Sequence, residues 1–161
     1  MRRLIIFFTT IFFQYGCIFT PPKSEINYAN NSIYHVSNHS LVGLAKNQIG
    51  IPYRYGGNTP DSGFDCSGFV HYVYKNSLNI NLPRRSIDQS RVGEFISKND
   101  LIDGDLLFFD TANRGHINHV GIYISDGKFI HASSGRAHCV VISDLNSGFY
   151  KRVFRFAKRV Y

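Results

Sequence analysis

The chain has one cysteine in a setting that favours nucleophilic chemistry. Cys66 lies in the stretch GFDCSGFVHYVYKN, whose apolar residues recur every three or four positions and predict a helix from about Cys66 to Asn76. Asp65 fits the N-cap of this helix, so Cys66 falls in the first turn and faces a packed sheet. The N–H groups and positive dipole end of a helix start are expected to lower the thiol pKa and to hold an oxyanion. The alternative is a buried cysteine that fills a gap between helix and sheet.

The cysteine count supports a free Cys66. Three cysteines, Cys17, Cys66 and Cys139, cannot all pair within one chain. A disulfide between Cys66 and Cys139 is one option in an oxidising compartment. Cys139, however, lies in the strand-like run HCVVIS, where a small buried thiol fits well. We therefore expect a structural thiol at Cys139 and a free thiol at Cys66.

A nucleophilic thiol needs a base, and two histidines lie on strands predicted to be neighbours. His119 opens HVGIYI and His131 lies in FIHASS, and between the two strands stands SDG. SDG suits a three-residue hairpin loop, a type I turn with its glycine in the left-handed position. In that register His119 faces Ser133 and His131 faces Gly121, so all four lie on one side of the sheet. A two-residue loop would put the histidines on opposite faces.

With both histidines on one face, His119 can take the thiol proton while His131 orients the ring of His119. Two unrelated strand histidines are the alternative. A zinc site made by Cys66, His119 and His131 is a second rival. The chain lacks short-spaced ligand pairs such as C-x-x-C or H-E-x-x-H, so no metal or other cofactor is expected. The other histidines fit loop, linker or surface positions: His35, His39, His71, His116 and His138.

The first residues have the features of an export signal. Residues 1–16 begin with two arginines and continue in an apolar run that is too short to span a bilayer. The run ends at Gly16-Cys17, which resembles a bacterial lipoprotein cleavage site, where Cys17 would be acylated. An ordinary secretory signal with an incidental cysteine is the alternative. Ile18 after the cysteine, in place of Asp, would by this resemblance direct a lipoprotein to the outer membrane, facing the periplasm of a Gram-negative cell.

The charge balance and composition describe one tethered, basic domain. Residues 17–39 are rich in Asn, Ser and Pro and are expected to form a flexible tether to a single domain at 40–161. The formal net charge is +7, and removal of residues 1–16 leaves 16 basic against 11 acidic residues, a charge of +5. Such a surface suits anionic cell-wall polymers or lipid head groups. Export argues against nucleic acid as a partner.

The predicted elements of the domain run from helices to strands. Ser40 is the expected N-cap of a helix that stops at Gly50. A later short helix has Ser86 and Gln89 at capping-box spacing and closes at Gly93. The predicted strands are 105–109, 119–124, 128–133, 139–143 and 153–160. Helices followed by a run of strands indicate an α+β domain with a mainly antiparallel sheet.

Six motifs then point to a known family. PYRYGG, FDCSGFV, LPR, DGDLLFF, HVGIYI and FIHAS follow one another from about residue 41 onwards and resemble the NlpC/P60 cysteine peptidases of bacterial cell walls. The resemblance implies a papain-like α+β fold, with N-terminal helices packed on the sheet. Position by position, it implies Cys66 as nucleophile, His119 as general base and His131 as the polar third residue.

The same resemblance extends to the surroundings of the nucleophile. It implies that Tyr53 of PYRYGG lies near Cys66, where its hydroxyl helps the oxyanion or the substrate. It also implies that Asp65 and Ser67 cap the helix and line the site, whereas Arg84 of LPR is treated as structural. The departures are a loop one residue longer in GGNTPDSGFDC, and an arginine at position 85 where the family often has Ser or Thr.

The family resemblance also implies an activity. Its members cleave amide bonds in peptidoglycan stem peptides, typically beside D-glutamate or meso-diaminopimelate, through a thiolate and an acyl-enzyme. We expect a monomeric hydrolase of stem peptides or cross-links, positioned by its lipid anchor and basic surface. An amidase or transpeptidase on the same fold is one alternative, and an inactive wall-binding lipoprotein is another. An inactive member would be expected to have lost the cysteine or a histidine, and neither is lost here.

Overall fold

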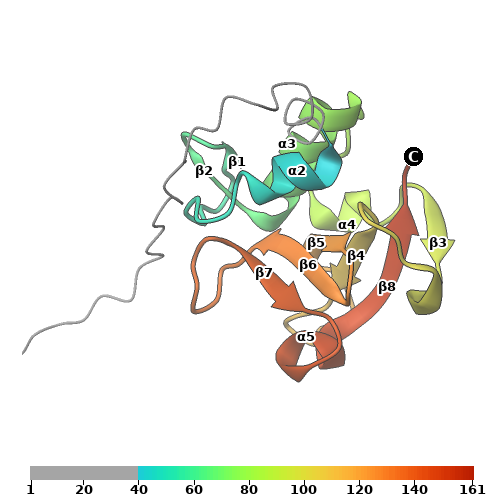
Figure 1. Cartoon of the computed structure of the whole chain (residues 1–161). Coiled ribbons are helices and arrows are strands. Elements are labelled where there is room, and N and C mark those ends of the chain that lie inside the picture. The colour runs from blue at the N-terminus through green and yellow to red at the C-terminus, as the bar shows by residue number, and fades with distance from the viewer. Residues whose placement is uncertain (1–39) are drawn as a thin grey trace, which may run out of the picture.

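The computed structural model describes residues 40–161, which form helices packed against a six-stranded antiparallel sheet (Figure 1). The predicted signal at 1–16, the lipidation of Cys17 and the tether at 17–39 lie outside the described residues. Within 40–161 no helix has both the length and the apolar character needed to cross a membrane.

Helices precede most of the strands, as predicted. They are α2 (Leu41–Lys46), α3 (Cys66–Leu78), α4 (Ser86–Gln89) and, near the end of the chain, α5 (Gly148–Val153), with a short 3-10 helix at Lys98–Asp100. Ser40 caps α2 by accepting the N–H of Gly43, but α2 ends at Lys46 and a turn covers 47–50. α3 continues past Asn76 because Asn79 adopts a left-handed conformation, φ 56°, and ends the helix there.

The capping box predicted for α4 is wrong. Arg85 is the N-cap residue and makes no side-chain capping bond, so Ser86 is already inside the helix. The Gln89 side chain instead donates hydrogen bonds to the carbonyls of Ser67 and Pro83. Gln89 therefore ties α4 to the first turn of α3, where Cys66 lies. The helix α5 was not predicted.

The strands match their predicted ranges to within one residue at each end. They are β1 (Asn58–Thr59), β2 (Gly63–Phe64), β3 (Glu94–Ile96), β4 (Leu106–Phe109), β5 (His119–Ile124), β6 (Lys128–Ala132), β7 (Val140–Asp144) and β8 (Phe154–Arg159). β1 and β2 pair only with each other, and neither they nor β3 were predicted. The large sheet has the order β3-β8-β4-β5-β6-β7, with antiparallel neighbours throughout.

Two hydrophobic clusters lie on opposite faces of this sheet. β4 shows the division, because Leu106 and Phe108 belong to the cluster under α2 and α3, whereas Leu107 and Phe109 belong to the cluster that includes Tyr150 of α5. Side chains that alternate along a strand point to opposite faces. The sheet is therefore covered by α3 on one side and by α5 on the other.

The hairpin between β5 and β6 has the predicted register but a different turn. Ile124 pairs with Lys128, as predicted. Both Asp126 and Gly127 have positive φ angles, 58° and 69°, and the Lys128 N–H donates to the Ser125 carbonyl, which makes this a tight turn and not the expected type I turn. Ser125 remains as an extra residue, and its N–H donates to Asp103. The side-chain bond to Asp103 lets a two-residue turn keep a three-residue register.

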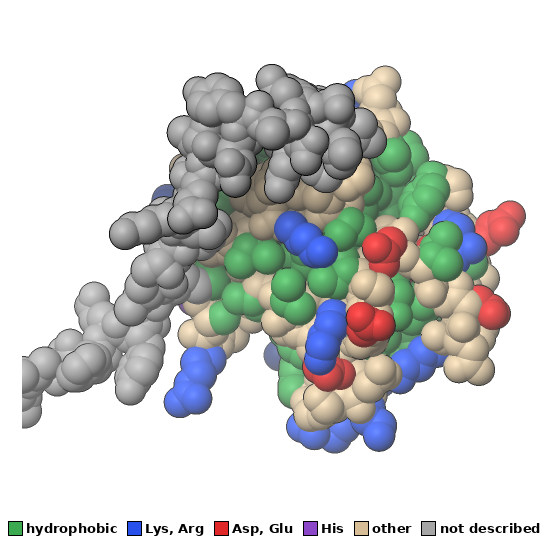
Figure 2. All heavy atoms as spheres, in the orientation of Figure 1, with side chains coloured by type: hydrophobic (Ala, Val, Ile, Leu, Met, Phe, Trp, Pro, Cys, Tyr) green, Lys and Arg blue, Asp and Glu red, His purple; other side chains and the backbone are tan. Residues whose placement is uncertain are grey.

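Charged side chains are unevenly spread over the face shown in Figure 2. Lys and Arg gather along its lower edge, in the region where Figure 1 places α5, whose last turn carries Lys151 and Arg152 (Figure 2). Acidic side chains lie higher on the same face (Figure 2).

Candidate active site

The start of α3 holds Cys66 against the sheet. Asp65 is the N-cap, as predicted, and its carboxylate accepts the N–H of Gly68 at 2.7 Å. Gly68 lies so close to the preceding loop that an added Cβ would stand 2.1 Å from the Gly57 carbonyl oxygen. The Asp65 N–H donates to that same carbonyl at 3.0 Å. The helix start is thus clamped to the glycine-rich loop, which fixes the position of the Cys66 sulfur.

Arg84 completes a buried ionic cluster beside the thiol. Its guanidinium forms a bidentate pair with Asp65, at 2.7 and 2.9 Å, and donates to the Ser67 hydroxyl at 3.1 Å. Burial alone would raise the pKa of Asp65, but hydrogen bonds from Arg84 and from backbone N–H groups lower it. Asp65 is therefore negatively charged at neutral pH. Arg84 holds both flanking residues of Cys66 and also lines the pocket beside it.

The expected lowering of the thiol pKa is wrong. Burial raises the pKa of Cys66 to about 11, with a further upward contribution from the negative charge of Asp65. The N–H groups of Val120, Ser67 and Cys66 itself act in the opposite direction but do not offset the loss of hydration. Burial likewise lowers the pKa of His119 to about 4. The resting site therefore holds a neutral thiol and a neutral imidazole.

The two histidines meet on one face of the sheet, as the predicted register requires. His119 Nε2 and His131 Nδ1 are 2.9 Å apart, and the two rings are perpendicular. Gly121 makes this possible, because a Cβ there would stand 2.6 Å from the Phe129 ring and 3.2 Å from the His131 Cβ. Burial and the charge of His119 lower the pKa of His131, which is fully buried. Both imidazoles are therefore neutral bases at pH 7.

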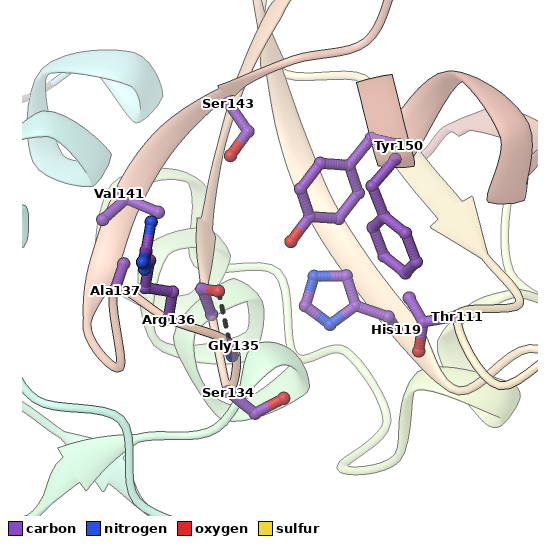
Figure 3. Close-up of a pocket in the computed structure, with 11 residues that line it drawn as sticks. Thr111, His119, Ser134, Gly135, Arg136, Ala137, Val141, Ser143 and Tyr150 are labelled. Carbon is purple, nitrogen blue, oxygen red and sulfur yellow. Dashed lines mark hydrogen bonds between the residues drawn. The ribbon is translucent and has the colours of Figure 1, made fainter. Parts of the chain in front are cut away.

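Two residues that the sequence did not single out complete this arrangement. The Ser143 hydroxyl lies 2.9 Å from His131 Nε2, which extends the series of hydrogen bonds to β7. Tyr150 of α5 stacks on His119 and meets His131 edge-on (Figure 3). Burial raises the pKa of Tyr150, while a hydrogen bond with Ser133 lowers it. Neither residue left a usable sequence signal, because α5 and the irregular loop between β6 and β7 were not predictable.

The thiol and the histidine pair belong to opposite sides of the sheet and meet at the end of β5. Cys66 packs with the cluster under α3, whereas His131 stacks on Phe129, which belongs to the cluster on the α5 face. His119 is the first residue of β5, and the next residue, Val120, directs its N–H at the Cys66 sulfur. The printed hydrogen bond of His119 uses Nε2, so Nδ1 is the nitrogen left to act on a thiol proton.

Two pockets flank this meeting point. A pocket of about 500 Å³ is lined by Cys66 together with Tyr53, Asp65, Ser67 and Arg84. Burial raises the pKa of Tyr53, and Cys66 and Asp65 raise it further, so its hydroxyl stays protonated beside the thiol. The predicted neighbours of Cys66 are therefore brought together around one opening.

The second pocket lies on the α5 side. It measures about 450 Å³, and His119, Tyr150 and Ser143 stand along its wall (Figure 3). His116 lines the Cys66 pocket but is exposed and directs Nδ1 toward the Arg114 carbonyl, as fits a loop residue.

Cysteine and metal chemistry can be compared with the predictions. Cys66 is the free cysteine among residues 40–161, whereas Cys139 is buried and disulfide-bonded, so the predicted thiol at Cys139 is wrong. In the same range no group of three His, Cys, Asp or Glu side chains is placed to hold a metal ion. The zinc site considered for Cys66, His119 and His131 thus has no ligand geometry.

A free thiol at a helix start, beside a strand that opens with one of two hydrogen-bonded histidines, has the nucleophile, base and orienting group of a cysteine hydrolase of the α+β class. Comparison with known proteins agrees with this class. The sequence profile of the NlpC/P60 family matches residues 50–159. The chain belongs to the NlpC/P60 family.

Curated relatives match the catalytic region only. Murein DD-endopeptidase MepH of Escherichia coli K12 is 41% identical over 115 residues, covering 70% of this chain and 42% of that protein. Gamma-DL-glutamyl hydrolase of Bacillus subtilis 168 is 43% identical over 111 residues, covering 69% and 26%. Murein DD-endopeptidase MepS/Murein LD-carboxypeptidase of E. coli K12 is 39% identical over 111 residues, covering 69% and 56%. The chain therefore spans less than two thirds of the length of these relatives.

Solved structures show the same fold. An NlpC/P60 family protein from Bacillus cereus ATCC 10987 superposes with a TM-score of 0.68 at 39% identity, covering 74% of this chain and 39% of that one. The NlpC/P60 domain of peptidoglycan hydrolase SagA superposes with a TM-score of 0.65 at 32% identity, covering 75% and 97%. The predicted α+β fold is confirmed.

Proposed function

We propose that this protein is a peptidoglycan hydrolase, a cysteine endopeptidase that cleaves amide bonds in stem peptides or in the cross-links between them. The observation that carries the proposal is the free Cys66 thiol at the start of α3, held against the N–H of the residue after His119. The printed names of the relatives, which include murein DD-endopeptidases and a gamma-DL-glutamyl hydrolase, support amide bonds of the cell wall as the substrate.

The reaction starts from a neutral pair. When a substrate carbonyl reaches Cys66, His119 Nδ1 accepts the thiol proton as the sulfur forms a bond to the carbonyl carbon. The resulting oxyanion accepts hydrogen bonds from N–H groups at the helix start, with the Tyr53 hydroxyl as a further donor. The C–N bond then breaks as His119 returns the proton to the amine nitrogen, which leaves a thioester on Cys66.

Hydrolysis repeats these steps with water. A water molecule gives a proton to His119 as its oxygen attacks the thioester carbon. Collapse of the second oxyanion breaks the C–S bond, the sulfur regains the proton from His119, and the carboxylate product departs. Burial serves this cycle because an imidazole with a pKa of about 4 is unprotonated, and so able to act as a base, at any pH near neutrality.

His131 and Ser143 set the tautomer of the base. For Nδ1 of His119 to accept a proton, its Nε2 must carry hydrogen and donate to His131 Nδ1. His131 then carries its own hydrogen on Nε2 and donates to the Ser143 hydroxyl. The series of hydrogen bonds is consistent in only this direction, so the role of His131 is to orient the base and fix its tautomer.

On the other side of the nucleophile, three side chains are placed to hold the acyl part of the substrate. Asp65 presents a negative carboxylate to the Cys66 pocket, and Tyr53 and Ser67 present hydroxyl groups. Asp65 and Ser67 are fixed by Arg84, so they offer a rigid polar wall to a peptide.

The decisive experiment is the digestion of purified peptidoglycan, with products identified by mass. The protein is expected to release new muropeptides, and Cys66→Ala is expected to release none. His119→Ala should also be inactive, while His116→Ala, which removes an exposed histidine from the same opening, should retain activity. Products from Cys66→Ala would show that Cys66 is not the nucleophile.

The same digestion separates the alternatives. A transpeptidase would form new cross-links when an acceptor amine is added, because amine and water attack the same thioester. A wall-binding lipoprotein would sediment with peptidoglycan and yield no products from any variant. Neither alternative is favoured by a specific contact in residues 40–161.

We further propose that Cys17 carries a lipid that anchors the protein to the outer membrane, facing the periplasm. The support is the basic start, short apolar run and Gly16-Cys17 junction of the sequence. Lipidation consumes the Cys17 thiol, so intact mass spectrometry should show a lipid adduct that Cys17→Ser lacks. A mature protein with an unmodified Cys17, or with Cys17 in a disulfide, would contradict the anchor.

A further inference from the structure

The pocket on the α5 side is placed to receive the group that leaves. His119 must hand its proton to the departing amine nitrogen, and His119 lines this pocket, whereas Cys66, which keeps the acyl group, lines the other one. The two halves of a bound peptide therefore extend in different directions from the scissile bond. The acyl half extends past Tyr53, and the leaving half extends into the pocket of about 450 Å³.

The charge of this pocket is simple. Arg136, in the loop between β6 and β7, is the one charged side chain among the described residues that line it, since His119 is neutral. Arg136 is exposed and makes no ion pair or side-chain hydrogen bond within residues 40–161. Figure 3 shows Arg136 on the wall opposite His119 and Tyr150, with the hollow between them (Figure 3).

The remaining wall is polar and fixed. Ser133 is nearly buried, and its hydroxyl accepts the N–H of Gly135 at 3.2 Å, which shapes the loop that carries Arg136 (Figure 3). Ser134 adds a second hydroxyl, and Phe149 adds an apolar surface that is 46% exposed. A cation with hydroxyl groups beside it and no carboxylate is a receptor for an anion.

Resting on the proposed hydrolysis, we infer that Arg136 binds a free carboxylate on the leaving residue of the substrate. The ligand class is an amino-acid residue whose departing amine and free carboxylate are borne by the same carbon. The guanidinium forms a bidentate pair with that carboxylate, and the amine is thereby held at His119 to receive its proton. Arg136 is a specificity residue, and the neutral amide analogue of the same leaving residue is a poor substrate.

This inference selects among the bonds of the wall. In the middle of a stem peptide the carboxyl group beside the amine is already used in the next amide bond, so Arg136 would find no charge there. A cross-link that ends on the side-chain amine of a diamino acid leaves the neighbouring carboxylate free. A terminal residue removed from a stem also carries a free carboxylate. The structure thus favours cross-links and terminal residues over internal stem bonds.

The test uses two synthetic cross-linked peptides that differ only in the carboxyl group beside the leaving amine, which is a carboxylate in one and a carboxamide in the other. For the full chain, kcat/KM for the carboxylate peptide should exceed that for the carboxamide by roughly ten- to a hundredfold, the range for a hydrogen-bonded charge. Arg136→Gln should bring this ratio close to one, and Arg136→Lys should keep part of it. Lys46→Gln removes the same charge on α2, far from both sets of lining residues, and should keep the full ratio.

The outcomes distinguish the inference from the function beneath it. Equal cleavage of both peptides by the unaltered protein, or an unchanged ratio in Arg136→Gln, would overturn the role of Arg136 and leave the hydrolase intact. Cleavage of neither peptide, together with no release from peptidoglycan, would overturn both. A ratio that collapses in Arg136→Gln and persists in Lys46→Gln would establish the carboxylate site.

Discussion

The hydrogen bond between His131 and Ser143 gives the sharpest test of how the site works. Ser143→Val removes the hydroxyl and fills its space with a methyl group, whereas Ser143→Thr keeps the hydroxyl on an equally branched side chain. Without the acceptor, the buried His131 has no reason to carry hydrogen on Nε2. Its other tautomer places hydrogen on Nδ1, which faces His119 Nε2 at 2.9 Å. His119 must then carry its hydrogen on Nδ1, where it cannot accept the thiol proton.

The size of the effect follows from the bond. A neutral hydrogen bond of this kind contributes about 1 kcal/mol, and an unsatisfied buried partner costs about 1–3 kcal/mol. Ser143 is only half-buried and lines the pocket, so solvent relieves part of the loss, and the lower end applies. We therefore expect kcat/KM of Ser143→Val to fall about tenfold below that of Ser143→Thr. The assay is peptide cleavage by both variants, with thermal unfolding as a check that both fold.

The comparison between the two variants decides the reasoning. If Ser143→Val and Ser143→Thr cleave equally fast and melt at similar temperatures, Ser143 does not set the tautomer of the histidine pair. If both lose activity alike, the backbone of β7 and not the hydroxyl is at fault. Only a loss confined to Ser143→Val supports the proposed direction of proton transfer.

Three further predictions concern the same site. The rate of Cys66 alkylation by iodoacetamide, with Cys66→Ala as background, should rise with pH toward about 11, because only the thiolate reacts and burial raises the pKa of the thiol; a rate already maximal near pH 6 would show a preformed ion pair. The free energy of unfolding should fall as pH drops below about 6.5, by roughly 3 kcal/mol at pH 4, because the pKa of His119 is about 4 folded and about 6.5 unfolded, so the unfolded chain binds more protons; a denaturation midpoint that stays constant from pH 7 to 4 would contradict this. Gly68→Ala should destabilise the fold by about 2–4 kcal/mol and abolish cleavage, since its Cβ would stand 2.1 Å from the Gly57 carbonyl oxygen; a stable, active variant in the same assays would show that the clamp on the helix start is dispensable.

The parts of the fold that sequence patterns predict are those set by local chemistry. The α3 start was predictable because Asp65 is a strong N-cap before a regular apolar period, and the β5–β6 register because Asp126-Gly127 specifies a tight turn. Even there the turn type was wrong, since the bond from Ser125 to Asp103 depends on a residue twenty-two positions earlier. The sequence could not contain that contact in any local form.

The parts that sequence patterns missed depend on packing between distant segments. Tyr150 reaches the histidine pair only because α5 folds over the sheet, and α5 has no side-chain cap and no buried residue to announce it. Arg84 was expected to be structural, yet it both holds Asp65 and lines the Cys66 pocket. The thiol pKa was missed for a similar reason. A helix start can be read from sequence, but the desolvation that outweighs its effect on Cys66 depends on the complete fold.

Burial of the histidine pair connects the stability of this domain to its chemistry. Removing His119 from water makes its protonated form costly, which weakens the fold in acid and keeps the base ready near neutral pH. The same burial raises the pKa of Cys66, so the thiol proton cannot leave until a carbonyl is present to accept the sulfur. A site of this kind does not hold a reactive thiolate in the free protein. The reactive state forms only in the complex, which suits an enzyme whose free thiol would otherwise be open to oxidation and alkylation outside the cytoplasm.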